Sequence, residues 1–259
     1  RMSSLRYGLD NWIYAAYSRA GGGRWREAFM GKGSPLHFPD KSGQRLAELL
    51  PGKNIRFMPD EYKAEVSGGM SQFGLSFDGQ ENQFTVWNNV HIRHVVINDK
   101  YAANNPYLSI NATMADISDH GNAAPVYSIA KDMLNLHESE MGHFTSACGI
   151  CEYTGGLFKD KYARASFVCE PVSNLVHADI LSPDGVTFKA ERAEKEKEFL
   201  ASVDSWFRPV NSTVGPDGAL YVVDFYRKLV EHPDWLAMAD STGFYTHAGK
   251  IKESDFLEG

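Results

Sequence analysis

Cysteine, positive charge and long apolar runs are all scarce in this sequence. Its 259 residues include 3 cysteines, and 26 lysines and arginines stand against 33 aspartates and glutamates, for a formal net charge of −7. A chain with this balance and no basic stripe does not fit nucleic acid as a partner. No apolar run reaches the roughly 18 residues of a membrane-spanning helix, so we expect no transmembrane segment.

The first residues lack the apolar core of a secretory signal peptide. They read Arg1-Met2-Ser3-Ser4, and we expect a processed or fragmentary chain rather than a natural N-terminus. The number of cysteines is odd, so at least one thiol is free or paired outside the chain.

Aromatic and turn-forming residues, by contrast, are frequent. Aromatic residues make up 12% of the chain, which also has 23 glycines and 11 prolines, and this mixture favours short strands joined by many turns. One pattern recurs, in which a turn-forming pair with aspartate lies next to a run of aromatic and β-branched residues. Its copies lie at residues 7–14, 73–87, 158–169 and 214–224.

Each copy of this pattern predicts a β-hairpin, because Asp-Gly and Asp-Asn supply the positive φ angles of a tight turn. Hairpins repeated at wide, uneven spacing indicate an all-β fold, a β-propeller whose blades carry loop insertions. A β-sandwich built from ordinary hairpins is the alternative. We expect an incomplete propeller of about four blades over residues 1–241, followed by a C-terminal tail or interaction segment at 242–259.

The densest group of chemically active side chains follows the second hairpin pattern. Its polar members are Asn89, His91, Arg93 and His94. Strand alternation predicts that His91 and Arg93 share one side, with Val90 and Ile92 on the other. Two imidazoles and a guanidinium on a propeller face suit an anionic or quinone cofactor, or a proton transfer. A polar hairpin with satisfied histidines is the alternative.

A second polar group surrounds the last hairpin pattern and contains Arg208, Asp224 and Arg227. The planar guanidinium of Arg208 suits a carboxylate ligand, and Asp224 ends a strand that we expect to open onto the same face. Alternatively, Arg208 and Asp224 pair with each other and join adjacent blades.

A third group, Glu170, Asn174 and His177, lies within an otherwise apolar run. These side chains offer oxygen or nitrogen to calcium or to a sugar, or they complete hydrogen bonds of the strands. The acidic loop 116–121 does not match the spacing of an EF-hand, and we interpret it as a turn, with metal binding as the alternative.

Cys148 and Cys151 have the spacing of a redox, haem or zinc motif but lack the rest of each motif. Glu152 occupies the place where haem attachment needs a histidine, and no second pair of zinc ligands is evident. We expect instead a disulfide bond between Cys148 and Cys169 on neighbouring strands, with Cys151 free.

Several stretches together resemble a known family, the membrane-bound or secreted dehydrogenases of planctomycete-type bacteria, which are related to the PQQ-dependent soluble aldose and sorbosone dehydrogenases. The stretches are residues 8–14, 67–74, 91–96, 104–107, 116–121, 144–149, 167–177, 207–210 and 215–224. The resemblance implies a six-bladed propeller, so the remaining blades are expected in a second fragment or have been lost. It also implies a periplasmic or secreted protein with a c-type cytochrome partner. The chain has no C-x-x-C-H motif and carries no haem itself.

The family also implies an activity. Its members use pyrroloquinoline quinone (PQQ) and calcium to take a hydride from a sugar or alcohol, and the electrons pass to the cytochrome. On this resemblance, His91 or His94 acts as the base, with Arg208 at the reacting centre. The expected cofactor residues are Arg208, Arg93, Asn89, Asp224 and Arg227, and the expected calcium ligands are Glu170, Asn174 and Asp224.

A non-catalytic propeller for carbohydrate binding or protein assembly is the second hypothesis. Two departures from the dehydrogenase pattern favour it. No histidine precedes the first hairpin, where the family has its general base, and residues 70–73 read Met-Ser-Gln-Phe in place of the family's Arg-Asn pair. The retained histidines and arginines favour the enzyme.

Overall fold

The computed structural model describes residues 2–17, 53–105, 107, 110, 112–131 and 141–230 of the chain. Within these ranges the fold is nearly all β, with one short α-helix, α3 (Asp99–Ala103), and three 3-10 helices. None of the described helices is long and apolar enough to span a lipid bilayer. The predicted tail at 242–259 lies outside the described residues.

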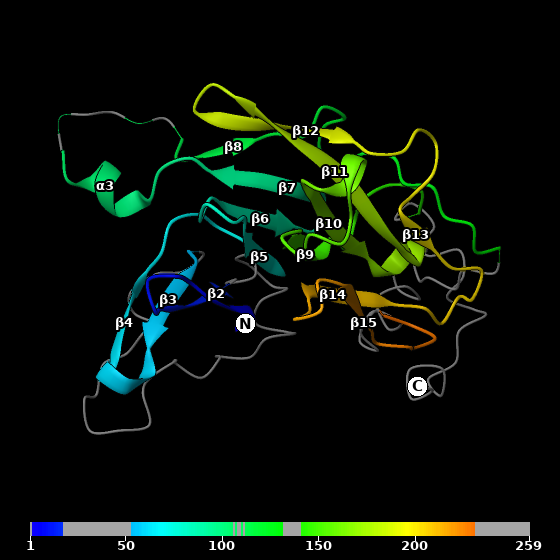
Figure 1. The fold of residues 1–259 in the computed structure, drawn as a ribbon, viewed down its shortest axis with the longest axis horizontal. Helices are drawn as coiled ribbons and strands as arrows, with labels where there is room; N and C mark the ends of the chain where they lie inside the picture. The colour runs from blue at the N-terminus through cyan, green and yellow to red at the C-terminus, as the bar shows by residue number, and fades with distance from the viewer. Residues whose placement is uncertain are drawn as a thin grey trace, which may run out of the picture.

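The strands form four antiparallel sheets that follow one another along the chain (Figure 1). The first contains β1 (Met2–Tyr7), β2 (Ile13–Tyr17), β3 (Ile55–Met58) and β4 (Lys63–Val66). The second contains β5 (Gly74–Phe77), β6 (Gln83–Trp87), β7 (Val90–Val95) and β8 (Met114–Asp116). The third contains β9 (Cys148–Glu152), β10 (Ala165–Glu170), β11 (Leu175–Asp184), β12 (Thr187–Arg192) and β13 (Leu200–Ala201), and the fourth contains β14 (Pro209–Val214) and β15 (Leu220–Asp224).

The connectivity of these sheets is that of propeller blades. In the first two sheets, and in the third from β9 to β12, each strand pairs with the next one along the chain. The first strands of the four sheets, β1, β5, β9 and β14, contact one another in that order. Consecutive meanders whose first strands gather together form a β-propeller. The predicted all-β propeller is therefore confirmed, and the described residues contain three blades and a fourth sheet of two strands.

Aspartate-containing turns close the hairpins as predicted, with one exception. In the last hairpin Gly218 has φ +80°, and Asp217 accepts a hydrogen bond from the main-chain N–H of Ala219. In the first hairpin Asn11 has φ +65°. The pattern at 158–169 differs, because Asp160–Tyr162 is a 3-10 helix in the loop before β10, and β10 pairs with β9 across that longer loop.

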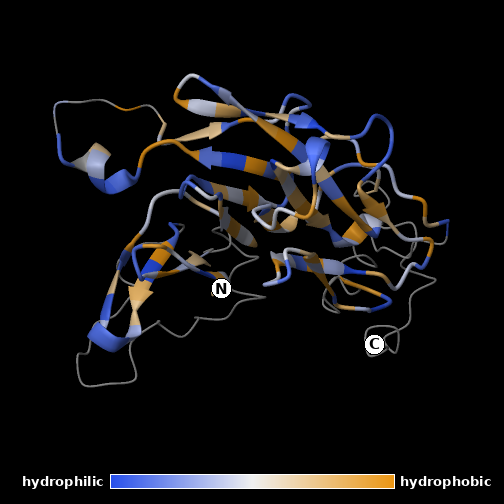
Figure 2. Cartoon of the chain, in the orientation of Figure 1, coloured by the Kyte–Doolittle hydropathy of each residue, from blue (hydrophilic) through white to orange (hydrophobic). Residues whose placement is uncertain are grey.

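Buried apolar side chains form clusters between neighbouring blades. Figure 2 shows the hydropathy of the residues along these strands. On β11, Leu175 packs with Phe84 and Ile92 of the second sheet, whereas Val176 packs towards Val214 of the fourth sheet. Side chains alternate along a strand, so β11 is covered by a blade on each side. Polar groups at residues 175–179 of this strand are therefore buried whichever way they point.

Arg6 of β1 ties the first strands of the sheets together. Its guanidinium donates to the carbonyl oxygens of Leu75 in β5 (3.4 Å), Ile150 in β9 (3.3 Å) and Ser212 in β14 (2.8 Å). It also donates to Thr213 Oγ1 (3.3 Å). One side chain thus satisfies main-chain acceptors of three other sheets at the place where those sheets meet.

All three cysteines are free and buried. Cys148 and Cys169 lie opposite each other on β9 and β10, but the expected disulfide bond between them is absent. Both belong to the apolar cluster between the third and fourth sheets, where a thiol packs as a small apolar side chain. Burial raises the pKa of Cys169 to about 12 and that of Cys151 to about 11, so neither forms the reactive thiolate at neutral pH.

Replacing Arg6 with methionine should destabilise the propeller. The substitution leaves an apolar stem but removes a charged donor from the carbonyl groups of three sheets, so we expect the free energy of unfolding to fall by about 2 kcal/mol. Urea denaturation followed by tryptophan fluorescence measures the change. Lys189→Met removes an exposed ion pair with Glu191 and should cost less than about 0.5 kcal/mol. An equally small effect at Arg6 would show that it does not join the blades.

The state of the cysteines can be checked by thiol titration without reductant. The folded protein should not react with Ellman's reagent, because its thiols are buried and protonated. In denaturant all 3 thiols should react. A single reactive thiol in the denatured chain would instead show that Cys148 and Cys169 form the disulfide bond expected from the sequence.

Candidate metal centre

Four side chains that suit a metal ion converge between the second and third sheets. They are His91, His120, His177 and Asp179, and one ligand atom from each lies within 4.8 Å of all the others. The side chains of His91, His177 and Asp179 are almost completely buried, and that of His120 is 15% exposed. These four residues are called the histidine cluster below.

A β-bulge in β7 points His91 into the cluster. The pairing of β6 with β7 changes register near their turn, so His91 and Ile92 together lie opposite a single residue of β6. Both side chains point to the third sheet, where Ile92 joins the apolar core and His91 contacts Asp179. Simple alternation places His91 with Arg93 and away from Ile92, and that prediction is wrong because of the extra residue.

Strand β11 supplies His177 and Asp179 by regular alternation. Both lie on the side of the strand that also carries Leu175, which packs against the second sheet. Two residues of spacing on a strand bring both side chains to one face. The two side chains therefore meet His91 across the interface between blades.

His120 comes from the loop after β8. Main-chain hydrogen bonds from Asp119 to Ala190 (2.9 Å) and from Ala123 to Asn89 (2.6 Å) hold this loop on both sides of His120. The centroid of its ring lies 4.7 and 5.4 Å from those of the other two histidines. The loop thus covers the cluster from the side of the outer strands β8 and β12.

The carboxylate of Asp179 is the point at which the imidazoles meet. Asp179 Oδ2 lies 3.0 Å from His91 Nε2, and Oδ1 lies 3.0 Å from His177 Nε2. Oδ1 also lies 3.8 Å from His120 Nε2. All three histidines therefore direct the same ring nitrogen to one carboxylate.

Further carboxylates hold the outer nitrogens of two histidines. His177 Nδ1 lies 2.6 Å from Glu198 Oε2, and His120 Nδ1 lies 2.7 Å from Asp119 Oδ1. The buried Glu198 side chain also pairs with Arg192 Nη1 at 3.1 Å. A carboxylate on the outer nitrogen fixes the ring orientation and makes the inner nitrogen a better metal ligand.

The pKa values differ sharply within the cluster. Burial lowers the pKa of His91 to about 4, and its hydrogen bond to Asp179 offsets only part of that effect. Burial also lowers the pKa of His177, but the nearby carboxylates of Asp179 and Glu198 outweigh it and raise the pKa to about 9. Burial raises the pKa of Asp179, and the two histidines reverse this and hold it well below its usual range. His177 is therefore cationic between the carboxylates of Asp179 and Glu198.

Two buried ring nitrogens of the cluster, His91 Nδ1 and His120 Nε2, have no hydrogen-bond partner among the described residues. An unpaired polar atom in a dry interior costs roughly 1–3 kcal/mol, and a cation at the centre would give His120 Nε2 a partner. Three imidazoles and one carboxylate suit zinc, copper, iron or manganese, whereas calcium prefers oxygen ligands alone. Without a metal ion, the same groups act as a charged network that joins two blades.

Arg208, predicted to hold the cofactor, is fully buried and binds carbonyl groups of the chain itself. Its guanidinium donates to the carbonyl oxygens of Pro171 (2.8 Å), Arg227 (3.1 Å) and Lys228 (2.7 Å). Asp224 Oδ1 accepts the main-chain N–H of Arg208 at 2.8 Å. These contacts fasten β14 to the turn after β10 and to the segment after β15.

The predicted calcium ligands each have main-chain partners of their own. Glu170 accepts the main-chain N–H of Ser146 (3.0 Å), and burial raises its pKa to about 7. Asn174 Nδ2 donates to the carbonyl oxygen of Phe207 (2.5 Å). Asp224, the last residue of β15, accepts the main-chain N–H groups of Arg208 and Tyr226. These contacts connect strands and loops of the chain.

The other predicted cofactor residues lie at or near the surface. Asn89 is exposed in the turn between β6 and β7. Arg93 Nε donates to Asp116 Oδ1 on the neighbouring strand β8 (2.6 Å). Arg227 lies over the ring of Phe225, 5.8 Å from its centroid. Of the residues predicted to hold the cofactor or to act as the base, His91 alone belongs to the histidine cluster, and His177, predicted as a ligand for calcium or a sugar, belongs to it as well.

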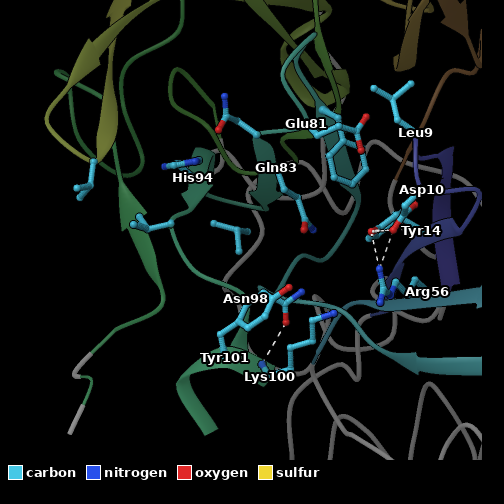
Figure 3. A pocket seen from close by; sticks show the side chains of 15 residues that line it. Leu9, Asp10, Tyr14, Arg56, Glu81, Gln83, His94, Asn98, Lys100 and Tyr101 are labelled. Atoms are coloured by element: carbon cyan, nitrogen blue, oxygen red, sulfur yellow. Dashed lines mark hydrogen bonds and ion pairs between the residues drawn. The ribbon is translucent and has the colours of Figure 1, made fainter. Parts of the chain in front are cut away.

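His94, the other predicted base, lines a separate groove of about 670 Å³ (Figure 3). The groove lies between the first two sheets and α3, and Asp10, Arg56 and Lys100 contribute to its polar walls. His94 Nδ1 lies 3.0 Å from Thr187 Oγ1. Burial lowers the pKa of His94, which favours the neutral imidazole. His91 and His94 share β7 but belong to different sites.

Sequence reasoning does not assemble the cluster. It names His177 only as a candidate ligand for calcium or a sugar, and it does not single out Asp179. It interprets the loop that contains His120 as a turn, with metal binding as the alternative. The available signal is the His-x-Asp spacing at 177–179, which places both side chains on one face of a strand. The approach of β7 and of the loop depends on the packing of blades.

A family model described as a domain of unknown function, DUF7133, matches residues 1–253. The chain belongs to this family. No curated protein matches it. Among solved structures, a protein from Thermus thermophilus with the provisional name oxidoreductase (glucose dehydrogenase) is 15% identical, with a TM-score of 0.41. The alignment covers 84% of this chain and 57% of that one, so the chain spans little more than half of that protein's length.

In this DUF7133 chain a row of polar side chains crosses the third sheet through Asp179. Glu152 of β9 lies opposite Ser166, Ser166 lies opposite Asp179, and Asp179 lies opposite Arg192 of β12. Ser166 Oγ donates to Glu152 Oε1 at 2.7 Å. Burial raises the pKa of Glu152 to about 8. Its carboxyl group is therefore mostly protonated at neutral pH and adds little negative charge beside the cluster.

The raised pKa of Glu152 predicts a pH-dependent stability. The folded state keeps this proton up to about pH 8, whereas an unfolded glutamate releases it near pH 4.5, so the free energy of unfolding should fall as the pH rises through this window. Glu152→Gln should reduce the fall by a few kcal/mol. Urea denaturation at several pH values checks this, with the exposed Glu191→Gln as the control. Parallel curves for wild type and Glu152→Gln would refute the assignment.

Proposed function

We propose that this chain carries the mononuclear transition-metal centre of a propeller-type oxidoreductase that acts on a sugar or alcohol. The observation that carries the proposal is the convergence of three imidazole nitrogens and one carboxylate oxygen within 4.8 Å. Imidazole and carboxylate together are the ligand set of many zinc, iron, copper and manganese sites. The outer carboxylates of Asp119 and Glu198 support it, because they already hold the rings with Nε2 inward.

The charge of the site also favours a cation. Asp179, Glu198 and Asp119 surround the cluster, while Arg192 offsets part of their charge. Binding of an ion to His177 Nε2 would release the proton that His177 otherwise carries, which leaves this negative charge uncompensated. A divalent ion bound to Asp179 would compensate this negative charge directly in a dry interface. The centre would then be held by both blades at once, since His91 belongs to the second sheet and Asp179 to the third.

The reaction class comes from the resemblance of the sequence to sugar dehydrogenases. A redox-active metal ion would accept electrons, and a zinc ion would polarise an alcohol oxygen as a Lewis acid. PQQ and calcium, with a c-type cytochrome as acceptor, are the alternative cofactor set that the resemblance implies. Arg208 donates to main-chain carbonyl groups, so its known contacts favour the metal centre over a quinone site built on that arginine.

Metal analysis of the purified chain tests the proposal. We expect about one transition-metal ion per chain, and His177→Ala and Asp179→Asn should each lower the affinity for that metal by roughly 100-fold or more, because they remove a ligand from the dry interior. His143→Ala is the matched control. Its ring contacts the main chain of Met141, outside the cluster, and it should keep the metal.

A dye-reduction assay over a panel of sugars and alcohols tests the activity. Activity should follow metal content across these variants. If PQQ and calcium restore activity to metal-free protein, and Asp179→Asn is as active as wild type, the quinone alternative replaces the metal-based one. Sugar binding without dye reduction by any substrate would favour the non-catalytic propeller instead.

A further inference from the structure

The four ligands of the histidine cluster are not equivalent. His91, His177 and Asp179 lie on strands β7 and β11, and their side chains are 1%, 1% and 0% exposed. His120 lies on a loop, and its side chain is 15% exposed. Three ligands are thus fixed by the blades in a dry interior, and the fourth closes the side nearest to solvent.

His120 is also the ligand held least tightly at the centre. Its Nε2 lies 3.8 Å from Asp179 Oδ1, compared with 3.0 Å for each of the other two histidines to the Asp179 carboxylate. This Nε2 has no hydrogen-bond partner among the described residues. Its Nδ1 contacts Asp119, the preceding residue, which belongs to the same loop. Within the described part of the chain, no hydrogen bond at Nε2 opposes withdrawal of the ring.

The backbone beside His120 allows such a movement. Gly121 has φ +80°, and apart from Gly121 and its two chain neighbours no described heavy atom lies within 4 Å of the position that a Cβ would take, so the loop borders open space there. Main-chain hydrogen bonds at Asp119 and Ala123 hold the loop on either side. A rotation about His120 and Gly121 would move the imidazole without breaking either of these anchors.

We infer that His120 is an exchangeable ligand. It closes the metal centre at rest and moves away from the metal ion when an oxygen donor, such as the hydroxyl group of an alcohol, binds there. The inference rests on the proposed metal centre. In the exchange the bond between the metal and His120 Nε2 breaks and a metal–oxygen bond forms, while His91, His177 and Asp179 stay bound. Three protein ligands with an exchangeable fourth position are typical of catalytic sites, and four fixed ligands are typical of structural ones.

The test uses the full chain loaded with Co²⁺, whose visible absorption reports the ligands around the ion. His120→Ala should bind Co²⁺ within roughly tenfold of the wild-type affinity, whereas His177→Ala should lose roughly 100-fold or more. Free imidazole should occupy the vacated position in His120→Ala. It should change that spectrum at concentrations roughly tenfold lower than in wild type or in the control His143→Ala.

Three results would contradict an exchangeable His120. A loss of Co²⁺ by His120→Ala as large as that by His177→Ala would overturn the inference and leave a closed metal site. Failure of imidazole to change the His120→Ala spectrum would also overturn it. If wild-type protein binds no Co²⁺, the proposed metal centre is wrong as well. Circular dichroism establishes that the variants fold, and His120→Asn replaces His120→Ala in the same assay if the alanine variant does not.

Discussion

The carboxylate of Asp179 joins two blades through the imidazoles of His91 and His177. It lies in an interface where its side chain is fully buried, so an unpaired negative charge there would be severely destabilising. The surrounding polar groups are arranged to compensate it. His177 keeps a proton between Asp179 and Glu198, and Arg192 balances Glu198 from the outer side.

The apolar packing around this carboxylate and its charged contacts depend on each other. Phe144 stacks on the ring of His91 with centroids 4.4 Å apart and meets His177 edge-on at 5.2 Å. Leu175 and Ile92 continue the same core. These side chains exclude water, which strengthens every interaction with Asp179 and increases the cost of losing one. In turn, hydrogen bonds across the interface fix how the second and third blades lie against each other.

Local chemistry explains which parts of the fold the sequence could predict. The Asp-Gly turn at 217–218 and the Asp-Asn turn at 10–11 carry their own conformational requirement, so those hairpins and the repeated architecture follow from short segments. The orientation of His91 does not. It depends on an extra residue in β7 relative to β6, and alternation within β7 alone gives the wrong side. Pairing between strands, rather than propensity within one, decides that side chain.

The assignment of Arg208 could not be corrected from sequence for a similar reason. An arginine after an aromatic pair has the same local signature whether it binds a cofactor or the chain itself. Its partners are the carbonyl groups of Pro171, Arg227 and Lys228. Every residue type has such a carbonyl group, so the sequence gives no sign of these contacts. Asp179, by contrast, has a weak signal in its spacing from His177, but the signal acquires meaning only when a second blade brings His91 opposite.

The position of the cluster between blades bears on how such a centre can work. Ligands on two packed strands cannot move apart without opening the apolar interface, so His91, His177 and Asp179 form a rigid part of the site. A loop ligand has no such cost, because the main-chain contacts around His120 are few and the space beside Gly121 is open. The same fold therefore supplies three rigid ligands that would hold an ion and one loop ligand that can move away from it. A centre buried by four strand residues would lack the second property, and a centre built on loops would lack the first.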